Sequence, residues 1–356
     1  VLKYDGSLWA GGRNHLGQLG DGTTQNRSTY VKIIDSGVFR IAANNVQSFF
    51  IKDNGSLWAM GSNNHGKLGN GQSYSFQPTP IQIVESGVTE VSAGHEHTLY
   101  VKEDGSAWGM GHNGKGRLGD GTATHRWSPV KILDANISRV YASNENSYFL
   151  KKDGTLWGCG DNIRRQLGTT SGDASWGLIK IAEDVVDASS FKHTLFFQKS
   201  DGNLHGIGLN NLHQFADGNE SYTHLPYTVE EVNVSSVSAG WNHNLFIKGD
   251  GSLWGMGYGA QAVIGTTWRP ESTPVKIMDE NVTHASAGVD HTLFLTSDGS
   301  LWGLGRRWDG KLGQNTTGGH NWTPHRIVNG NVTHCSAGNA HSLFVKSDGS
   351  LWGMGN

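Results

Sequence analysis

A phrase of eight residues recurs along this chain at almost constant spacing. Its commonest form is Asp-Gly-Ser-Leu-Trp-Gly-Met-Gly, and successive copies start 49, 50, 49, 48, 49, 48 and 50 residues apart. A period this regular predicts one structural unit repeated in series. No interval can hold a further domain, so we expect residues 1–356 to form a single domain, or a segment of a longer array. The eight copies begin at Asp5, Asn54, Asp104, Asp153, Asp201, Asp250, Asp298 and Asp348.

One repeat, read from Val91 onward, predicts four short strands and no helix. The second strand alternates so that apolar side chains occupy both of its faces. Asp104-Gly105 is a hairpin turn, because this pair tolerates a positive φ angle. Pro129 suits the edge of a sheet, since proline has no N–H group to donate. The expected strands span residues 91–94, 97–102, 106–111 and 128–132.

A sheet that is apolar on both faces needs a neighbour on each side. Four-stranded sheets packed face to face in series are the blades of a β-propeller, and this all-β fold is our prediction. Seven intervals of about 49 residues predict seven blades, with the repeated tryptophan lying between adjacent blades. Because the phrase occurs eight times, an eighth blade is an open alternative. Residues 30–33 could complete the last blade by pairing N-terminal with C-terminal strands.

The segment before each phrase resembles the signature of the regulator-of-chromosome-condensation repeat family. That signature is an apolar residue, two small residues and glycine, then two free positions, histidine, a small residue and an apolar pair. VSAGHEHTLYV (91–101) and ASAGVDHTLFL (285–295) match it throughout. The resemblance extends over essentially the whole chain and implies a seven-bladed propeller.

Members of this family differ in function, so the resemblance alone implies no single activity. The founding type is a nucleotide-exchange factor for a small nuclear GTPase that also binds chromatin. Another member is a secreted inhibitor of β-lactamases, and many bacterial members look like exported or surface repeat proteins. The exchange factor depends on particular loop insertions, and the even intervals of this chain argue against large insertions.

Composition argues against several classes of partner. The formal net charge is −3 and no run of lysine and arginine occurs, so nucleic acid is not expected as the principal ligand. No apolar run approaches the ~18 residues of a membrane span. Charged residues make up only 17% of a chain rich in Asn, Ser and Thr, which favours an extracellular or cell-surface location over a cytoplasmic one. Cys159 and Cys335 are expected to be buried free thiols.

The motifs that resemble catalytic or cofactor sites do not fit the expected fold. Residues 109–114 read GMGHNG, but the dinucleotide fingerprint requires a strand that leads into a helix. The histidine that recurs at one repeat position is expected to hydrogen-bond the backbone of its own or the next blade. His95-Glu96-His97 resembles a metal triplet, yet only one repeat contains it. We therefore expect no enzymatic activity, no cofactor and no metal.

The direction of the strands places two kinds of loop at the same end of every blade. The strand that contains the repeated histidine runs away from a two-residue turn, and the Leu-Trp strand runs back. The two-residue turns and the long Asn/Gly-rich loops therefore share one end, and the Asp-Gly turns occupy the other. The first end varies in sequence between repeats, and recognition is usually built from variable loops on a rigid frame.

We predict that this variable-loop end binds a protein or a glycan, and that the chain is a non-catalytic scaffold. Tryptophan and arginine are enriched in binding hot spots. Tryptophans outside the phrase could instead pack, half-buried, over loop glycines. Alternative functions are a self-associating repeat segment of a large surface protein or filament, an enzyme inhibitor, and a small-GTPase exchange factor. The candidate binding residues are His95, Glu96, Phe191, Lys192, Trp241, Asn242, Trp268, Asp290, Arg306, Arg307, Trp308 and Trp322.

Overall fold

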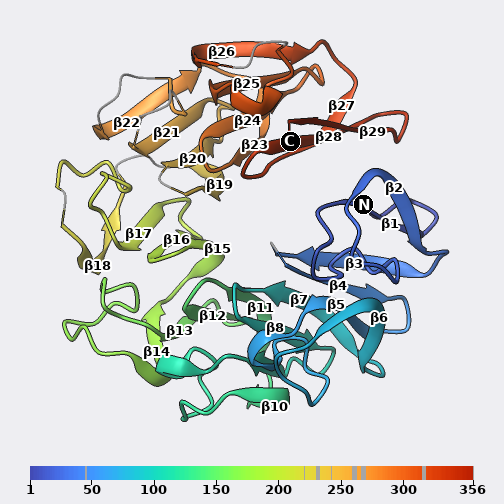
Figure 1. Ribbon diagram of the computed structural model, residues 1–356. Helices are drawn as coiled ribbons and strands as arrows, with labels where there is room; N and C mark the ends of the chain where they lie inside the picture. Colours follow the sequence, from blue (N-terminus) through green and yellow to red (C-terminus); the bar gives the residue numbers. More distant parts are fainter. Residues whose placement is uncertain are drawn as a thin grey trace. The chain divides into compact units, whose positions relative to one another are not determined.

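The structure is a computed structural model that divides into two compact units. It describes residues 1–44, 46–219, 221–229, 233–241, 243–258, 263–265, 270–314 and 318–355. The first unit contains Val1–Ile163 and Ser171–Val185, and the second contains Arg164–Thr170 and Val186–Asn356. Each unit consists of antiparallel β-sheets joined by turns and loops (Figure 1). Whether residues 1–356 act as one domain stays a prediction.

The first unit contains one two-stranded sheet followed by three four-stranded sheets. The two-stranded sheet pairs β1 (Leu8–Gly12) with β2 (Arg27–Ile34). The four-stranded sheets are β3 (Val38–Ala43), β4 (Gln47–Lys52), β5 (Leu57–Ser62) and β6 (Phe76–Val84); β7 (Val88–Ala93), β8 (His97–Lys102), β9 (Ala107–Gly111) and β10 (Arg126–Leu133); and β11 (Ile137–Ala142), β12 (Asn146–Lys151), β13 (Leu156–Gly160) and β14 (Ser175–Ala182).

The second unit contains three four-stranded sheets and one three-stranded sheet. The four-stranded sheets are β15 (Val185–Phe191), β16 (Thr194–Lys199), β17 (Leu204–Gly208) and β18 (Thr223–Thr228); β19 (Val234–Ala239), β20 (His243–Lys248), β21 (Leu253–Tyr258) and β22 (Pro270–Met278); and β23 (Val282–Ala287), β24 (His291–Thr296), β25 (Leu301–Arg306) and β26 (His320–Val328). The three-stranded sheet contains β27 (Val332–Ala337), β28 (His341–Lys346) and β29 (Leu351–Gly355).

The fold is a seven-bladed β-propeller of four-stranded antiparallel blades, as the repeat predicts. Six blades are complete four-stranded sheets, and the two-stranded and three-stranded sheets are formed by the N-terminal and C-terminal strands. In the repeat from Val91, the four observed strands are β7 to β10. The outermost strand, β10, starts before and ends after the expected range of 128–132. Pro129 lies in β10, an edge strand, as expected. Residues 30–33 belong to β2 and pair with β1, so their pairing with the last blade stays a prediction.

The Asp-Gly phrase recurs because it builds a hairpin turn that contacts the next blade. Gly105 adopts a φ of 77°, which L-residues rarely tolerate. The Ser106 backbone N–H and hydroxyl both donate to Asp104 Oδ1, at 2.8 and 2.5 Å, and Trp108 Nε1 donates to the serine oxygen at 2.9 Å. The Ile137 N–H then donates to the Gly105 carbonyl at 3.0 Å. The phrase therefore fixes a turn, a tryptophan and the start of the following sheet.

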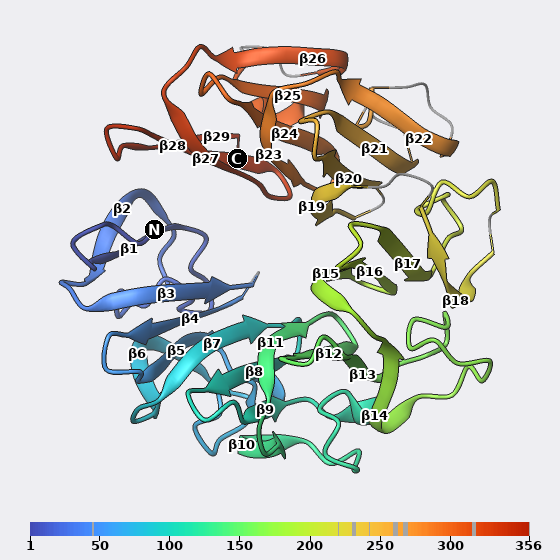
Figure 2. The ribbon, with the colours of Figure 1, turned by 180° about the vertical axis from the view of Figure 1, so that it is seen from behind.

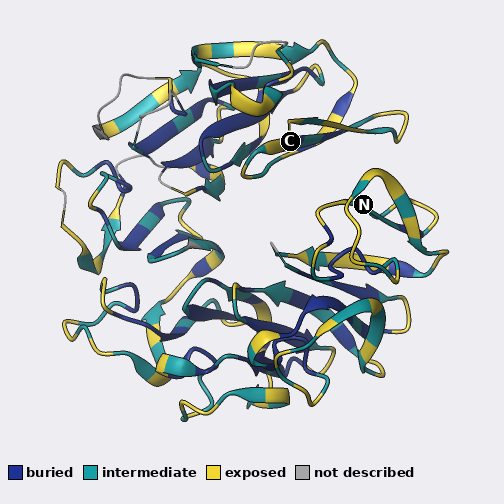
Figure 3. Cartoon of the chain, viewed as in Figure 1, coloured by how far each residue is buried: buried dark blue, intermediate teal, exposed yellow. Residues whose placement is uncertain are grey.

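The core lies between successive sheets, because each middle strand is apolar on both faces. Tyr100 of β8 packs with Phe49 of the preceding sheet, and Leu99 packs with Phe149 of the following sheet. All four side chains are buried. The repeated Trp108 packs against the first of these clusters, as expected. Figure 3 shows buried residues along the middle strands and exposed residues along outer strands such as β10 and β26, and Figure 2 shows the same sheets from behind.

Three of the repeated histidines bond to hydroxyl groups of the next blade. The Ser147 hydroxyl donates to the Arg117 carbonyl at 2.5 Å, so it accepts from His97 Nε2, which lies 2.9 Å away. The partner of Nε2 is thus a side chain of the next blade, and the backbone of Asn146, in that same blade, also interacts with this ring. The same contact joins His243 Nε2 to Thr292 Oγ1 at 3.0 Å and His291 Nε2 to Ser342 Oγ at 2.8 Å.

The two cysteines are buried free thiols, as expected. Burial raises the pKa of the Cys335 thiol to about 12 and that of Cys159 further still, so neither is a thiolate at neutral pH. In the part of the chain that the structure describes, no helix has the length and apolar character needed to cross a membrane. The named helical segments of that part are three short 3-10 turns: η1 (Asn64–Gly66), η2 (Gly114–Gly116) and η4 (Trp308–Gly310).

We predict that acid destabilises the fold below about pH 6.5, the ordinary histidine pKa. Burial lowers the pKa of His97 and His291, and lowers that of His243 to about 3. Below pH 6.5 the unfolded chain binds protons that the folded chain does not, so stability is complete above that pH and falls as pH falls toward the folded pKa values. Each histidine should contribute about 1.4 kcal/mol per pH unit to the slope.

Urea unfolding between pH 7.5 and 5 measures this slope, in a window above the range where carboxylates titrate. His243→Gln should make the slope shallower, because one titrating group is removed. A free energy of unfolding that stays constant or rises over this window would contradict the prediction.

Candidate binding surface at the variable-loop end

Backbone hydrogen bonds confirm that the two-residue turns and the long loops share one end of each sheet. The His112 N–H, just after β9, donates to the carbonyl of Glu96 in the turn before β8, at 2.9 Å. In the second unit, the Arg306 N–H donates in the same way to the Asp290 carbonyl at 2.9 Å. The Asp-Gly turn lies at the opposite end of β8, so the constant and the variable loops are separated by the length of a strand.

The two-residue turns of successive sheets also contact one another. In the second unit, the Trp241 N–H donates to the Gly288 carbonyl and the Val289 N–H donates to the Gly338 carbonyl, each at 3.3 Å. The innermost turns therefore form a continuous row within this unit. Side chains that project from them are held at fixed positions relative to each other, which reduces the ordering cost of binding.

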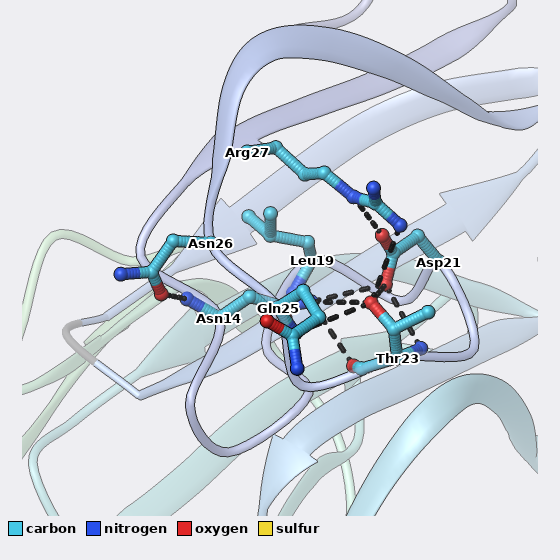
Figure 4. Close-up of polar contacts among 7 residues, drawn as sticks. All are labelled: Asn14, Leu19, Asp21, Thr23, Gln25, Asn26 and Arg27. Carbon is cyan, nitrogen blue, oxygen red and sulfur yellow. Dashed lines mark hydrogen bonds and ion pairs between the residues drawn. The ribbon is translucent and has the colours of Figure 1, made fainter.

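A buried asparagine organises four of the long loops, as Figure 4 shows for the first one. Asn14 Nδ2 donates to Asp21 Oδ1 and to the Thr23 carbonyl, each at 3.0 Å, and Asn14 Oδ1 accepts from the Leu19 N–H at 3.0 Å. Arg27 Nε lies 2.6 Å from Asp21 Oδ2. Burial alone would raise the pKa of Asp21, but hydrogen bonds from Thr23 and Arg27 lower it to about 2. The loop is thus held together by hydrogen bonds and an ion pair within it.

A further sequence pattern marks this asparagine, in addition to the repeat phrase and the histidine signature. The buried asparagine is followed seven residues later by Asp or Asn, whose side-chain oxygen accepts from it. A spacing that recurs in loops of otherwise different sequence indicates a shared contact. The four pairs are Asn14 with Asp21, Asn63 with Asn70, Asn113 with Asp120, and Asn210 with Asp217.

Two predicted binding residues, Lys192 and Trp241, form one contact in the second unit. Lys192 Nζ lies 3.2 Å from the centre of the Trp241 ring, a cation–π geometry. Partial burial lowers the pKa of Lys192. The tryptophan remains 43% exposed, so ring surface is available to a partner. The two residues come from turns of successive sheets, which the sequence alone did not place together.

Four further residues of the second unit meet around a carboxylate. Asp290 Oδ1 lies 2.5 Å from Lys311 Nζ, Asp290 Oδ2 lies 3.3 Å from Arg306 Nη1, and the Arg306 guanidinium lies 4.0 Å from the centre of the Trp308 ring. Burial opposes ionisation, yet the nearby His291 and the hydrogen bond from Lys311 lower the pKa of Asp290 to about 2. Asp290 is itself buried, whereas Trp308 is 46% exposed. Asp290 thus orients Arg306, and Trp308 presents the contact surface.

His95 and Glu96, in the first unit, lie in a two-residue turn as predicted. His95 is exposed, with Nδ1 3.4 Å from Glu96 Oε1, and Glu96 Oε2 lies 3.3 Å from the buried Lys67 Nζ. His97 is buried and bonds to Ser147 in the next sheet. One histidine is therefore exposed and the other is buried, so they do not form a metal triplet.

The remaining predicted residues are more dispersed. The Arg307 N–H donates to the Gly319 carbonyl at 3.0 Å, and the half-buried Trp322 lies in β26 with its ring centre 5.7 Å from that of His320. Phe191 ends β15, and its side chain is outside the described part of the structure. Asn242 and Trp268 lie outside the described residues.

Two tryptophans outside the phrase pack over loop glycines, as the competing interpretation proposed. A methyl group added to Gly66 would lie 2.6 Å from Trp127 Cα, and one added to Gly116 would lie 2.3 Å from Trp176 Cα. These two glycines allow the close approach that a side chain would block. Trp127 and Trp176 are nevertheless 49% and 54% exposed.

Three histidines of the first unit also converge at this end, and no sequence pattern predicts their meeting. His65, His112 and His125 each offer a ring nitrogen within 4.8 Å of the others. Burial lowers the pKa of His112 to about 4 and also lowers that of His125. They come from two loops at irregular spacing, so no local motif marks them.

Comparisons with known proteins agree with this fold. The family model described as RCC1-like domain matches residues 1–279. Human WBSCR16 has a TM-score of 0.75 and 19% identity, covering 95% of this chain and 97% of its own. Prp20p from Saccharomyces cerevisiae, characterised with its binding to Gsp1p and histones, has a TM-score of 0.71 and 18% identity over 95% of this chain and 91% of its own.

A further structure, yeast RCC1 (Prp20) with Kap60 bound to it, has a TM-score of 0.72 and 17% identity, covering 100% of this chain and 90% of the matched chain. Identities at this level establish a common fold and no common activity. No curated protein sequence matches the chain.

We predict that Asn63→Ala destabilises the first unit by about 1–3 kcal/mol, because it removes the acceptor of the buried Leu68 N–H and leaves that group unsatisfied. Denaturant unfolding measures the change. The matched control is Asn64→Ala, which alters the exposed neighbour in the same loop. Equal effects of the two substitutions would show that the buried asparagine does not organise the loop.

Proposed function

The chain belongs to the RCC1-like domain family, and on that premise we propose that it is a non-catalytic propeller that binds a protein partner through its variable-loop end. Prp20p, of similar fold, was characterised with its binding to Gsp1p and histones, and yeast RCC1 (Prp20) was crystallised with Kap60. Those partners are properties of those proteins. They support a protein, rather than a small molecule, as the class of ligand here.

One observation carries the proposal: two half-exposed tryptophans, each with a cation over its ring, project from adjoining loops of the second unit. They are Trp241 with Lys192 and Trp308 with Arg306. The turn from Gly288 to Asp290 joins them, since Gly288 accepts from the Trp241 N–H and Asp290 accepts from the Arg306 N–H. An aromatic ring beside a cation is the composition of an interface hot spot.

Both pairs are restrained before a partner arrives. Asp290 holds Arg306, and the cation–π contacts hold the rings, so few side-chain rotamers are lost on binding. The partner surface that fits combines an apolar group for each ring with a carboxylate for the adjacent cation. An acidic segment that also contains aromatic or aliphatic residues has this chemistry.

We predict that Trp241→Ala combined with Trp308→Ala weakens partner binding by more than about 100-fold without unfolding the chain. Each hot-spot truncation typically costs about 2 kcal/mol or more, and half-exposed side chains contribute little to the core. The partner is captured on immobilised chain, identified by mass spectrometry, purified and titrated against both forms.

The matched control is Trp127→Ala combined with Trp176→Ala, which removes two equally exposed tryptophans from the first unit. This control should bind as the native chain does. A large loss of thermal stability in the Trp241/Trp308 variant would assign those rings to the core. Capture of only a glycan would favour a glycan-binding scaffold instead. Capture of only further copies of the chain would favour a self-associating repeat segment.

An exported or surface-associated location is part of this proposal and has separate support. Only 17% of residues are charged, and the polar surface is supplied largely by Asn, Ser and Thr. Fractionation of the source cells, with detection of the chain by antibody, distinguishes this location from a cytoplasmic one.

A further inference from the structure

Three imidazole rings from two successive blades of the first unit meet at the variable-loop end. His65 lies in η1, His112 follows β9, and His125 precedes β10. The ring centres of His112 and His125 are 4.2 Å apart, and that of His65 lies 4.6 and 5.2 Å from them. One nitrogen of each ring lies within 4.8 Å of the other two. Each of the three side chains is partly exposed, so the cluster is open to solvent.

The backbone that carries these rings is held in place. His65 adopts a φ of 60°, an uncommon conformation for a residue with a side chain. The N–H of the following Gly66 donates to the Asn63 carbonyl at 2.9 Å, which closes the turn. The His112 N–H is bonded to the Glu96 carbonyl. The convergence is therefore built by ordered loops.

The ring nitrogens are not all occupied by the protein. Nδ1 of His65 is buried and has no hydrogen-bond partner, which is unusual for a buried polar atom. His112 Nδ1 accepts from the Gly114 N–H at 3.1 Å, and His125 Nδ1 accepts from the Asn113 N–H at 3.0 Å. In these two rings Nδ1 is already hydrogen-bonded, so Nε2 is the nitrogen that remains for a ligand.

We propose that His65, His112 and His125 bind a transition-metal ion, with Zn²⁺ as the best match. Zinc sites are commonly built from three imidazoles, with a fourth position left to water or to a ligand. Nitrogen-only ligands select zinc, nickel, cobalt or copper over magnesium and calcium, which prefer oxygen. The partial exposure of the three rings leaves room for that fourth ligand.

Metal binding would compete with the two backbone hydrogen bonds. A neutral ring whose Nδ1 accepts a hydrogen bond carries its proton on Nε2, so that nitrogen cannot bind a metal until the proton moves to Nδ1 or the ring turns. The hydrogen bonds from Asn113 and Gly114 would then be lost, so their amide groups would exchange faster with solvent. Coordination would thus change the conformation of the loop after β9, and zinc would act on the binding surface as well as on the rings.

The charges around the cluster bear on its affinity. In addition to desolvation, the positive charge of the buried Arg117 lowers the pKa of His112, and the negative charge of Glu145 raises it. Glu145 also lies 2.8 Å from Lys115 Nζ, so its charge is shared. The surroundings therefore do not favour a divalent ion by charge alone, and the three nitrogen ligands must supply the affinity.

Calorimetric titration of the whole chain with ZnCl₂ tests the proposal, with MgCl₂ as the comparison ion. We expect saturable binding of one zinc and no binding of magnesium. His65→Ala is the principal variant, because its Nδ1 has no hydrogen bond to lose, and it should weaken zinc binding by more than about 10-fold. His15→Ala, which removes an exposed histidine from the equivalent loop of the first repeat, should bind zinc as the native chain does.

His112→Ala and His125→Ala also remove loop hydrogen bonds, so the native chain provides a second readout. Zinc should shift the amide NMR signals of Asn113 and Gly114 and speed their hydrogen exchange, while signals of the second unit stay unchanged. Absence of saturable zinc binding would overturn the proposal. Zinc binding that His65→Ala leaves intact, or that leaves both amide signals in place, would overturn it as well.

Discussion

The structure depends on the face-to-face packing of sheets that are apolar on both sides. A middle strand such as β8 buries Tyr100 against the preceding sheet and Leu99 against the following one, so no single sheet has a core of its own. Stability in such an array comes from the contacts between neighbours. The polar contacts between blades follow the same rule, because His97 bonds to Ser147 of the next sheet and the Ser147 hydroxyl continues to the Arg117 carbonyl.

This arrangement leaves the loops at one end free to differ. The Asp-Gly turns make contacts between blades, and their sequence is nearly constant for that reason. At the opposite end, a buried asparagine such as Asn14 is hydrogen-bonded across four of the long loops from inside. The outer residues at this end differ between repeats, and Trp241 and Trp308 lie half-exposed there, each beside a cation that restrains its ring.

Charged residues at this end serve mainly to orient other side chains. Asp290 is surrounded by Arg306 and Lys311, so its carboxylate is satisfied within the protein. The consequence is a fixed guanidinium over Trp308. A buried ion pair of this kind adds little net stability after desolvation, and its use here is to set geometry.

The amino-acid pattern alone predicts the repeat, the four strands of a blade, the double-sided core and the end at which the variable loops lie. Period and alternation are local properties, and they fix which face each side chain takes. The meeting of residues from different repeats is a property of the folded chain: Lys192 contacts Trp241, Asp290 contacts Lys311, and His65 meets two histidines of the next blade. The period places their turns and loops side by side, but which side chains touch depends on the conformation of each loop, and no spacing along the chain encodes that. The same reason separates the histidines of the His95-Glu96-His97 triplet, since His97 begins β8 and is buried whereas His95 lies exposed in the turn before it.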